Sequence, residues 1–189
     1  MMSSRSGRAV SPVVANVLLV AVVVILAATV SVFALGFAEE ATKPGPVVGQ
    51  SSGTLEANTV GDGNGIVRLT HVAGDRIPVP EMEVVVDATD ACGKKGRLVN
   101  LPVDRYGGKA IGPANIEGDD IFDERSYNSD GTPDENAIHG SEYTASDQIA
   151  FRIPDTDCTI EKAEEITVRV VHTPTESVPI TKTLTATSQ

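Results

Sequence analysis

Basic residues are scarce in this chain of 189 residues. It contains 15 lysines and arginines against 26 acidic residues, which leaves a formal net charge of −11 at pH 7. A strong excess of negative charge repels the phosphate backbone, so it argues against nucleic acid as a partner. High net charge also keeps a protein dispersed, a property that halophiles use, and the composition fits a salt-rich environment.

The chain also lacks the short motifs that usually mark catalysis. It contains no GxSxG, HExxH or P-loop pattern, each of which sets a nucleophile, metal ligands or a phosphate cradle at fixed spacing. Its three histidines are His71, His139 and His172. Two of them fall in predicted strands and could meet in space, but a hydrolase would also need a nucleophile and an orienting acid nearby. We therefore expect no enzymatic activity, no cofactor, and structural or surface roles for the histidines.

Cysteine occurs only at Cys92 and Cys158. Neither belongs to a CxxC pattern and no paired histidines accompany them, so they do not indicate a metal site. Two alternatives stay open, a disulfide and two unpaired thiols. In an oxidising compartment a disulfide would close a loop of about 66 residues and stabilise the fold by roughly 4 kcal/mol.

One acidic loop partly matches a calcium-binding pattern. Four residues follow the spacing D-x-[DN]-x-[DN]-G, with serine in place of the first aspartate: Ser126, Asn128, Asp130 and Gly131. The twelfth position is Ala137 instead of the glutamate that usually supplies a bidentate ligand, although calcium needs six or more oxygens. A solvated acidic loop is the better interpretation, so we expect no metal site and keep Asn128 and Asp130 as weak calcium candidates.

The chain has, instead, one long apolar stretch. Residues 10–38 contain no charged side chain, whereas Arg5 and Arg8 precede them and Glu39 and Glu40 follow them. As a helix, about 25 of these residues span roughly 37 Å, enough to cross a hydrocarbon core of about 30 Å with some tilt. Lipid requires every backbone polar group to bond internally, so we expect a helix despite the many β-branched residues.

Three interpretations of this stretch remain open at this point. The first is a permanent single-pass membrane anchor. The second is a secretory signal peptide cut after Ala38, although its apolar core is longer than the usual 7–15 residues. In the third, a short basic leader is removed on the cytoplasmic side and the apolar helix stays on the mature protein.

The residues around Val10 favour the third interpretation. Arg8-Ala9 followed by Val10-Ser11-Pro12-Val13-Val14 and an unbroken apolar run resembles the class III signal peptide of archaeal type IV pilins, most closely the haloarchaeal ones. The resemblance implies cleavage between Ala9 and Val10 by a prepilin peptidase, with Arg5 and Arg8 as the leader charges. Val14 stands where bacterial pilins usually carry a glutamate, so the bacterial mode of subunit docking is not expected.

Charge also predicts the orientation of the chain in a membrane. Because Arg5 and Arg8 lie directly before the apolar stretch, the N-terminus should stay in the cytoplasm and everything after Glu39 should lie outside. Removal of a leader that carries these two arginines would take the formal charge from −11 to −13.

After residue 50 the period of the apolar residues changes from helical to two, which is typical of half-buried antiparallel strands. Expected strand segments are residues 55–59, 66–72, 84–86, 98–101, 149–153, 166–170 and 178–184, with loops and up to two short strands in 104–147. Seven to nine short strands predict an antiparallel β-sandwich, Ig-like, so the fold class is α+β. Beyond the N-terminal helix, only one helical turn is expected, at residues 161–165.

These elements predict four parts: a leader at residues 1–9, an apolar transmembrane and filament-core helix at 10–38, a junction at 39–50, and an extracellular β-sandwich head at 51–189. Pro44-Gly45-Pro46 marks the junction because it stops a helix and favours turn or extended structure.

The resemblance implies a structural subunit of an archaeal type IV pilus, which polymerises through its helix into a surface filament for adhesion. It implies further copies of the chain, the membrane before assembly, a prepilin peptidase, and an assembly ATPase with a membrane platform as partners. The alternative is a membrane-anchored extracellular β-sandwich binding module that does not polymerise. An archaellin fits less well, because its leader typically has glycine and a following glutamine around the cut.

Overall fold

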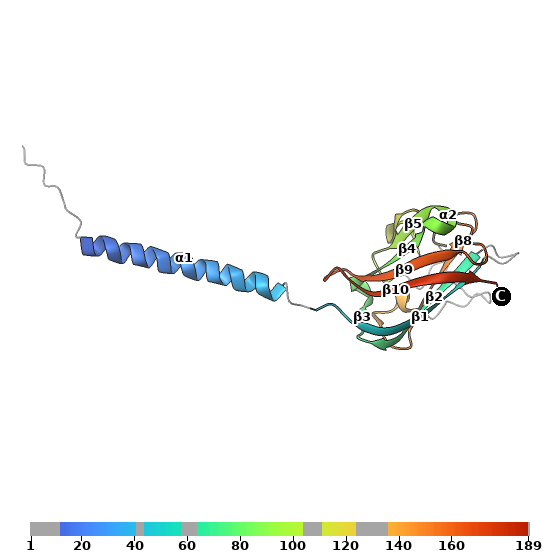
Figure 1. Cartoon of the computed structure of the whole chain (residues 1–189), viewed down its shortest axis with the longest axis horizontal. Coiled ribbons are helices and arrows are strands. Elements are labelled where there is room, and N and C mark those ends of the chain that lie inside the picture. Colours follow the sequence, from blue (N-terminus) through green and yellow to red (C-terminus); the bar gives the residue numbers. More distant parts are fainter. Residues whose placement is uncertain (1–11, 41–43, 58–63, 104–110, 124–135, 189) are drawn as a thin grey trace, which may run out of the picture. The chain divides into compact units, whose positions relative to one another are not determined.

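The chain forms two compact units, Met1–Pro44 and Gly45–Gln189. The computed structural model describes residues 12–40, 44–57, 64–103, 111–123 and 136–188. The first unit contains the helix α1, and the second, which we call the head, contains the strands (Figure 1). The predicted α+β class, a long apolar N-terminal helix followed by a mostly β head, is confirmed.

Helix α1 runs from Pro12 to Glu40 and has 29 residues, about 43 Å at 1.5 Å per residue. It begins at Pro12, where the missing N–H would have had no partner within the helix. Its end and the start of the first strand both fall within the predicted junction of residues 39–50.

The described part of the head contains ten strands and four short helices. In chain order they are β1 (Val48–Glu56), β2 (Asn64–Gly74), β3 (Ile77–Pro78), η1 (Val79–Glu81), β4 (Met82–Ala88), α2 (Thr89–Cys92), β5 (Lys94–Leu98), η2 (Pro113–Asn115), β6 (Ile116–Gly118), η3 (Ala137–His139), β7 (Glu142–Tyr143), β8 (Gln148–Pro154), β9 (Glu165–His172) and β10 (Ser177–Thr187).

Eight of these strands form one sheet in the order β6-β5-β4-β9-β10-β1-β2-β8, and β3 pairs with β7 separately. All neighbours run antiparallel except β1 and β10, which run parallel and pair only at Leu55↔Ala186 and Glu56↔Thr187. This parallel pair corrects the prediction of a purely antiparallel head. The two strands come from opposite ends of the head sequence, so no hairpin turn fixes their relative direction.

The eight-stranded sheet curls around a single apolar core, to which strands from both ends of the sheet order contribute. Phe122 shows the closure most directly. Its ring lies 5.5 Å from that of Phe151 in β8, in an edge-to-face arrangement. A Cβ atom placed on Gly96 in β5 would lie 2.8 Å from the same Phe122 ring. Because β8 and β5 stand near opposite ends of the sheet order, one side chain can touch both only if the sheet folds over.

The strands with the clearest alternation in the sequence bury the predicted side chains. Ile149, Phe151 and Ile153 are buried in β8, and alternate residues from Ile166 to Val170 are buried in β9. Residues 84–86 of β4 are all buried, as predicted for a strand that is covered on both faces. Alternation in the sequence therefore located these strands correctly.

The sequence places Val178, Ile180 and Leu184 in one apolar row, and the burial of β10 does not follow that row at its start. Val178 is 46% exposed, and the buried row consists of Ile180, Leu184 and Ala186. The pairing of β10 with β9 shifts register between Ser177 and Ile180, so Val178 lies ahead of the regular ladder. Such a shift changes which side chains face the core, and the apolar pattern alone does not reveal it.

The structure also differs from the prediction for short helices and for one strand. The strand predicted at residues 98–101 lies earlier in the chain, as β5 (Lys94–Leu98). Residues 161–165 contain a simple turn and the start of β9, where one turn of helix was predicted. Helix α2 was not predicted. It ends at Gly93, which adopts a left-handed conformation with φ of 75°, and a glycine at this position is a common helix stop signal.

The outer edge of β8, the last strand of the sheet, is covered by loop residues. The Asn136 side chain accepts a hydrogen bond from Ala150 N at 3.0 Å and donates one to Ala150 O. Asp123 N donates to Arg152 O at 2.9 Å. Asn136 thus gives the edge strand one donor and one acceptor, as a neighbouring strand would. It is 9% exposed, so these bonds lie largely away from water.

Replacement of Asn136 by alanine should destabilise the head markedly. The substitution leaves the N–H and C=O groups of Ala150 without these partners, and each unsatisfied buried group costs about 1–3 kcal/mol. Every residue of the buried core cluster lies between Leu55 and Ala186, so thermal melting of a fragment comprising residues 45–189 is a suitable measurement. The exposed Gln50→Ala serves as control and should melt like the wild type. Equal melting of Asn136→Ala and wild type would contradict the role of Asn136.

Candidate functional site

Between Val13 and Phe33 the surface of α1 is almost entirely apolar on every side. From Val13 to Phe33 the helix is long and apolar enough to cross a membrane. Its large side chains are mostly exposed in the single chain, as in Leu19 at 65% and Phe33 at 70%. At about 25 cal/mol per Å² of apolar surface, contact of such a helix with water costs tens of kcal/mol. The helix therefore requires lipid or other apolar surfaces around it.

Two hydroxyl groups interrupt this surface, and both are satisfied by the helix itself. Thr29 Oγ1 donates to Leu26 O at 2.8 Å, and Ser31 Oγ donates to Ala27 O at 2.8 Å. Such bonds to the preceding turn are common for Ser and Thr in helices. Since neither donor is left free, both side chains can enter an apolar environment without the penalty of an unpaired polar group.

Several residues predicted from the sequence to matter lie outside the described residues. These are the processing site, Ala9 and Val10, the leader charges Arg5 and Arg8, and the calcium candidates Asn128 and Asp130. Among the residues that the structure does describe, no group of three or more His, Cys, Asp or Glu side chains is arranged to hold a metal ion.

The structure joins Cys92 and Cys158 by a disulfide, with the two Cα atoms 5.5 Å apart. Cys92 ends α2, between β4 and β5, whereas buried Cys158 follows β8. The bond therefore links the β4–β5 connection to the segment after β8, the strand at the opposite end of the sheet order. It is a second connection, besides Phe122, across the curled sheet.

The three histidines have separate surroundings. His71 is fully buried beside Tyr143, with ring centroids 5.3 Å apart, and its ring nitrogens have no hydrogen-bond partner. His172 lies within 2.7 Å of Thr175 Oγ1 and 3.2 Å of Glu81 Oε2. His139 Nδ1 lies 3.2 Å from a backbone carbonyl oxygen, that of Val103. His172 thus bridges a hydroxyl of the β9–β10 connection and the Glu81 carboxylate of η1, one on each ring nitrogen.

Tyr143, which packs against His71, supplies a buried hydrogen bond. Its hydroxyl donates to Leu69 O at 2.9 Å. Burial raises the pKa of this phenol, and the nearby negative charge of Asp147 raises it further. The group therefore stays protonated and keeps donating to the backbone of β2 at any pH the fold experiences.

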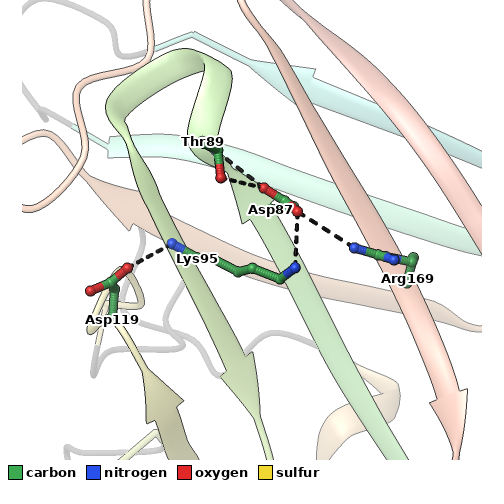
Figure 2. Close-up of polar contacts among 5 residues, drawn as sticks. All are labelled: Asp87, Thr89, Lys95, Asp119 and Arg169. Atoms are coloured by element: carbon green, nitrogen blue, oxygen red, sulfur yellow. Dashed lines mark hydrogen bonds and ion pairs between the residues drawn. The ribbon is translucent and has the colours of Figure 1, made fainter.

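The most connected polar cluster in the described head surrounds Asp87 in β4 (Figure 2). Thr89 Oγ1 donates to Asp87 Oδ1 at 2.6 Å, and Lys95 Nζ lies 3.1 Å from Asp87 Oδ2. Arg169 Nη2, from β9, lies 3.5 Å from the same oxygen. On the other side of Lys95, its backbone N–H donates to Asp119 Oδ2 at 2.8 Å. The cluster thus connects β4 to both of its neighbours, β5 and β9.

A surface depression of about 360 Å³ lies beside this cluster. Its lining residues are Asp87, Thr89, Asp90, Glu165, Thr167 and Thr183. Carboxylates and hydroxyls predominate there, but the two cations of the cluster already engage Asp87. The arrangement is that of a solvated ion-pair network on a sheet face, where each pair contributes little alone.

Sequence reasoning did not identify the Asp87 cluster. Asp87 opposes Lys95 on β5, while Val85 opposes Arg169 on β9. These contacts depend on cross-strand register, which a single sequence does not provide. The only local signal was the pair Asp87 and Thr89, whose spacing is typical of a side-chain turn before a helix.

The Asp87 carboxylate should stabilise the head only above acidic pH. Hydrogen bonds from Thr89 and Lys95 lower its pKa below the ordinary value of 3.8. A carboxylate with a lowered pKa contributes stability above its unfolded value, and this contribution is lost as the pH falls through the folded value. Asp87→Asn should therefore melt below the wild type at pH 7 and converge with it as the pH falls through the lowered folded pKa of Asp87.

Asp90→Asn is the matched control, because Asp90 lines the same depression but lies outside the Asp87 ion-pair network. It should shift the melting temperature little at either pH. A difference between Asp87→Asn and wild type that persists unchanged at low pH would exclude the carboxylate charge as its cause.

Comparison with known proteins gives one finding, in the N-terminal part of the chain. Residues 8–49 match the family model described as archaeal type IV pilin, N-terminal. The matched segment starts at Arg8, contains the whole of α1, and ends within β1. No curated protein matches the chain. The resemblance of the first forty residues to this family is thereby confirmed.

Proposed function

We propose that this chain, whose residues 8–49 carry the archaeal type IV pilin N-terminal domain, is a structural pilus subunit that polymerises through α1 into a surface filament. The observation that carries the proposal is the long, charge-free span of α1 from Val13 to Phe33, which is apolar on every face. The proposed role is structural, with adhesion as the use of the filament and no catalytic step.

In the assembled state, the apolar surface of α1 is most favourably placed inside a bundle of identical helices. Transfer from lipid into such a bundle exchanges one apolar environment for another, so the hydrophobic contribution nearly cancels, and packing and lipid release decide the balance. Exposure to water is far less favourable. Subunits would therefore enter the filament directly from the bilayer, and a repeated contact that does not close on itself generates a helical filament.

The proposal includes the domain organisation expected from the sequence. Residues 1–9 form a leader that a prepilin peptidase removes, residues 10–38 form the membrane and filament-core helix, 39–50 the junction, and 51–189 the extracellular head. The disulfide in the head is consistent with an oxidising location outside the cell. An assembly ATPase and a membrane platform are the further partners that the proposed family role requires.

Polymerisation predicts that surface filaments contain this chain. Filaments sheared from cells and purified by density should give its head peptides in mass spectrometry, and deletion of its gene should remove those peptides together with the filaments that it builds. Retention of all copies in the membrane, with filaments that lack the chain, would instead support a non-polymerising anchored binding module.

Leader removal predicts that the mature protein begins at Val10. N-terminal mass spectrometry should detect this residue, and Ala9→Phe should block processing because it places a large side chain at the cleaved bond. Ser4→Phe adds the same bulk within the leader, away from the bond, and should be processed normally. A mature chain that begins at Met1 or at Glu39 would refute the proposed cleavage.

A further inference from the structure

The negative charge of the head is distributed unevenly. Only two of the 26 acidic residues and three of the 15 basic residues precede residue 45, so the head carries a net charge of −12. In contrast, Pro44–Leu55 contains no charged residue, and Ser177–Gln189 contains only Lys182. These two segments hold nearly all of β1 and the whole of β10.

The two uncharged segments lie next to each other in the folded head, although they come from its opposite sequence ends. At one end, β1 and β10 pair in parallel at Leu55↔Ala186 and Glu56↔Thr187. Further along, a Cβ atom on Gly53 would lie 2.7 Å from Leu184 Cδ2. At the other end, a side chain on Gly45 would overlap that of Ser177. The fold therefore places β1 beside β10, and the uncharged residues of the two segments with them (Figure 1).

The exposed side chains of this surface are neutral and mostly small, with Val47 and Val178 as larger apolar exceptions. We call it the β1–β10 strip and define it by five exposed residues: Ser52, Thr54, Thr181, Thr183 and Thr185. Their spacing of two places them on one side of each strand. Lys182, between Thr181 and Thr183 in the sequence, is half-buried and by the same spacing belongs to the other side of β10.

Charged groups of both signs begin where the strip ends, since Arg68 of β2 opposes Thr54, and Arg169 and Glu165 of β9 oppose Thr181 and Thr185. Glu165 accepts a hydrogen bond from Thr185 Oγ1 at 3.0 Å and, with Asp87 and Asp90, lines the depression that also includes Thr183. On the other side, Glu56 at the end of β1 is ion-paired with Arg68 of β2. The strip is thus a neutral surface bounded by charge on both sides.

We propose that the β1–β10 strip is the surface through which the head contacts the head of a neighbouring copy of this chain. The inference rests on the proposed polymerisation through α1, which brings heads of identical negative charge together. Like charges repel, and salt screens that repulsion over distance but does not remove the cost of stripping water from a carboxylate at a contact. The strip is where two such heads can meet without burying carboxylates, and its hydroxyls can hydrogen-bond across the contact.

Cross-linking of purified filaments tests the contact. In the described chain both native cysteines are already bonded, so an introduced cysteine supplies the free thiol. Filaments built from Thr54→Cys, Thr181→Cys and the double variant should form covalent dimers and higher species with a short bismaleimide. Ser141→Cys, at an exposed residue of the β3–β7 side of the head, is the control and should stay monomeric.

Added charge tests the physical reason. Thr181→Glu, alone or with Ser52→Glu, should lower the amount of the chain in filaments by about tenfold or more, which corresponds to a modest change in contact free energy. Ser141→Glu adds the same charge outside the strip and should change that amount less than about twofold. Thr181→Gln adds similar bulk without charge and should assemble like the wild type.

The outcomes separate this inference from the proposed function. Filaments that lack the wild-type chain refute polymerisation itself. Filaments that contain the chain but give no strip cross-links, or equal cross-links at Ser141, overturn the strip while leaving polymerisation intact. Normal assembly of Thr181→Glu also overturns the proposed contact between heads. If that variant assembles normally but its filaments no longer attach to surfaces, the strip binds an external ligand instead.

Discussion

The apolar surface of α1 must be kept from water, and the remaining structure is organised around that requirement. A helix with apolar side chains on every face has no side to turn toward solvent, unlike the amphipathic helices of most soluble proteins. Thr29 and Ser31 do not relax the requirement, because their hydroxyls bond to the carbonyls of their own helix. Most of the acidic residues lie instead in the head, after residue 45.

The head reaches a closed core through contacts between segments that are distant in the sequence. Phe122 touches both β8 and the region of β5, and the bond between Cys92 and Cys158 spans the same interval. With the parallel pairing of β1 and β10, these contacts bring the two ends of the head sequence together. A head closed in this way needs no support from α1, which agrees with its division from the helical unit.

Features that depend on residues near one another in the sequence were predictable. The apolar run, its flanking charges and the alternation in β8 and β9 are all local, and they located the helix and these strands. Features set by pairing between distant segments were not. The parallel direction of β1 and β10, the exposure of Val178 and the partners of Asp87 each follow from register, which no single segment contains. Helix α2 is too short to show a period of 3.6 residues.

The covered edge of β8 has a consequence for any setting in which many heads are crowded together. An open strand edge presents unpaired N–H and C=O groups that recruit further strands, and high local concentration favours such fusion. Asn136 and Asp123 already occupy these groups on Ala150 and Arg152. Neighbouring heads would therefore be kept from merging along this edge into one continuous, aggregated sheet, and each would stay a separately folded body.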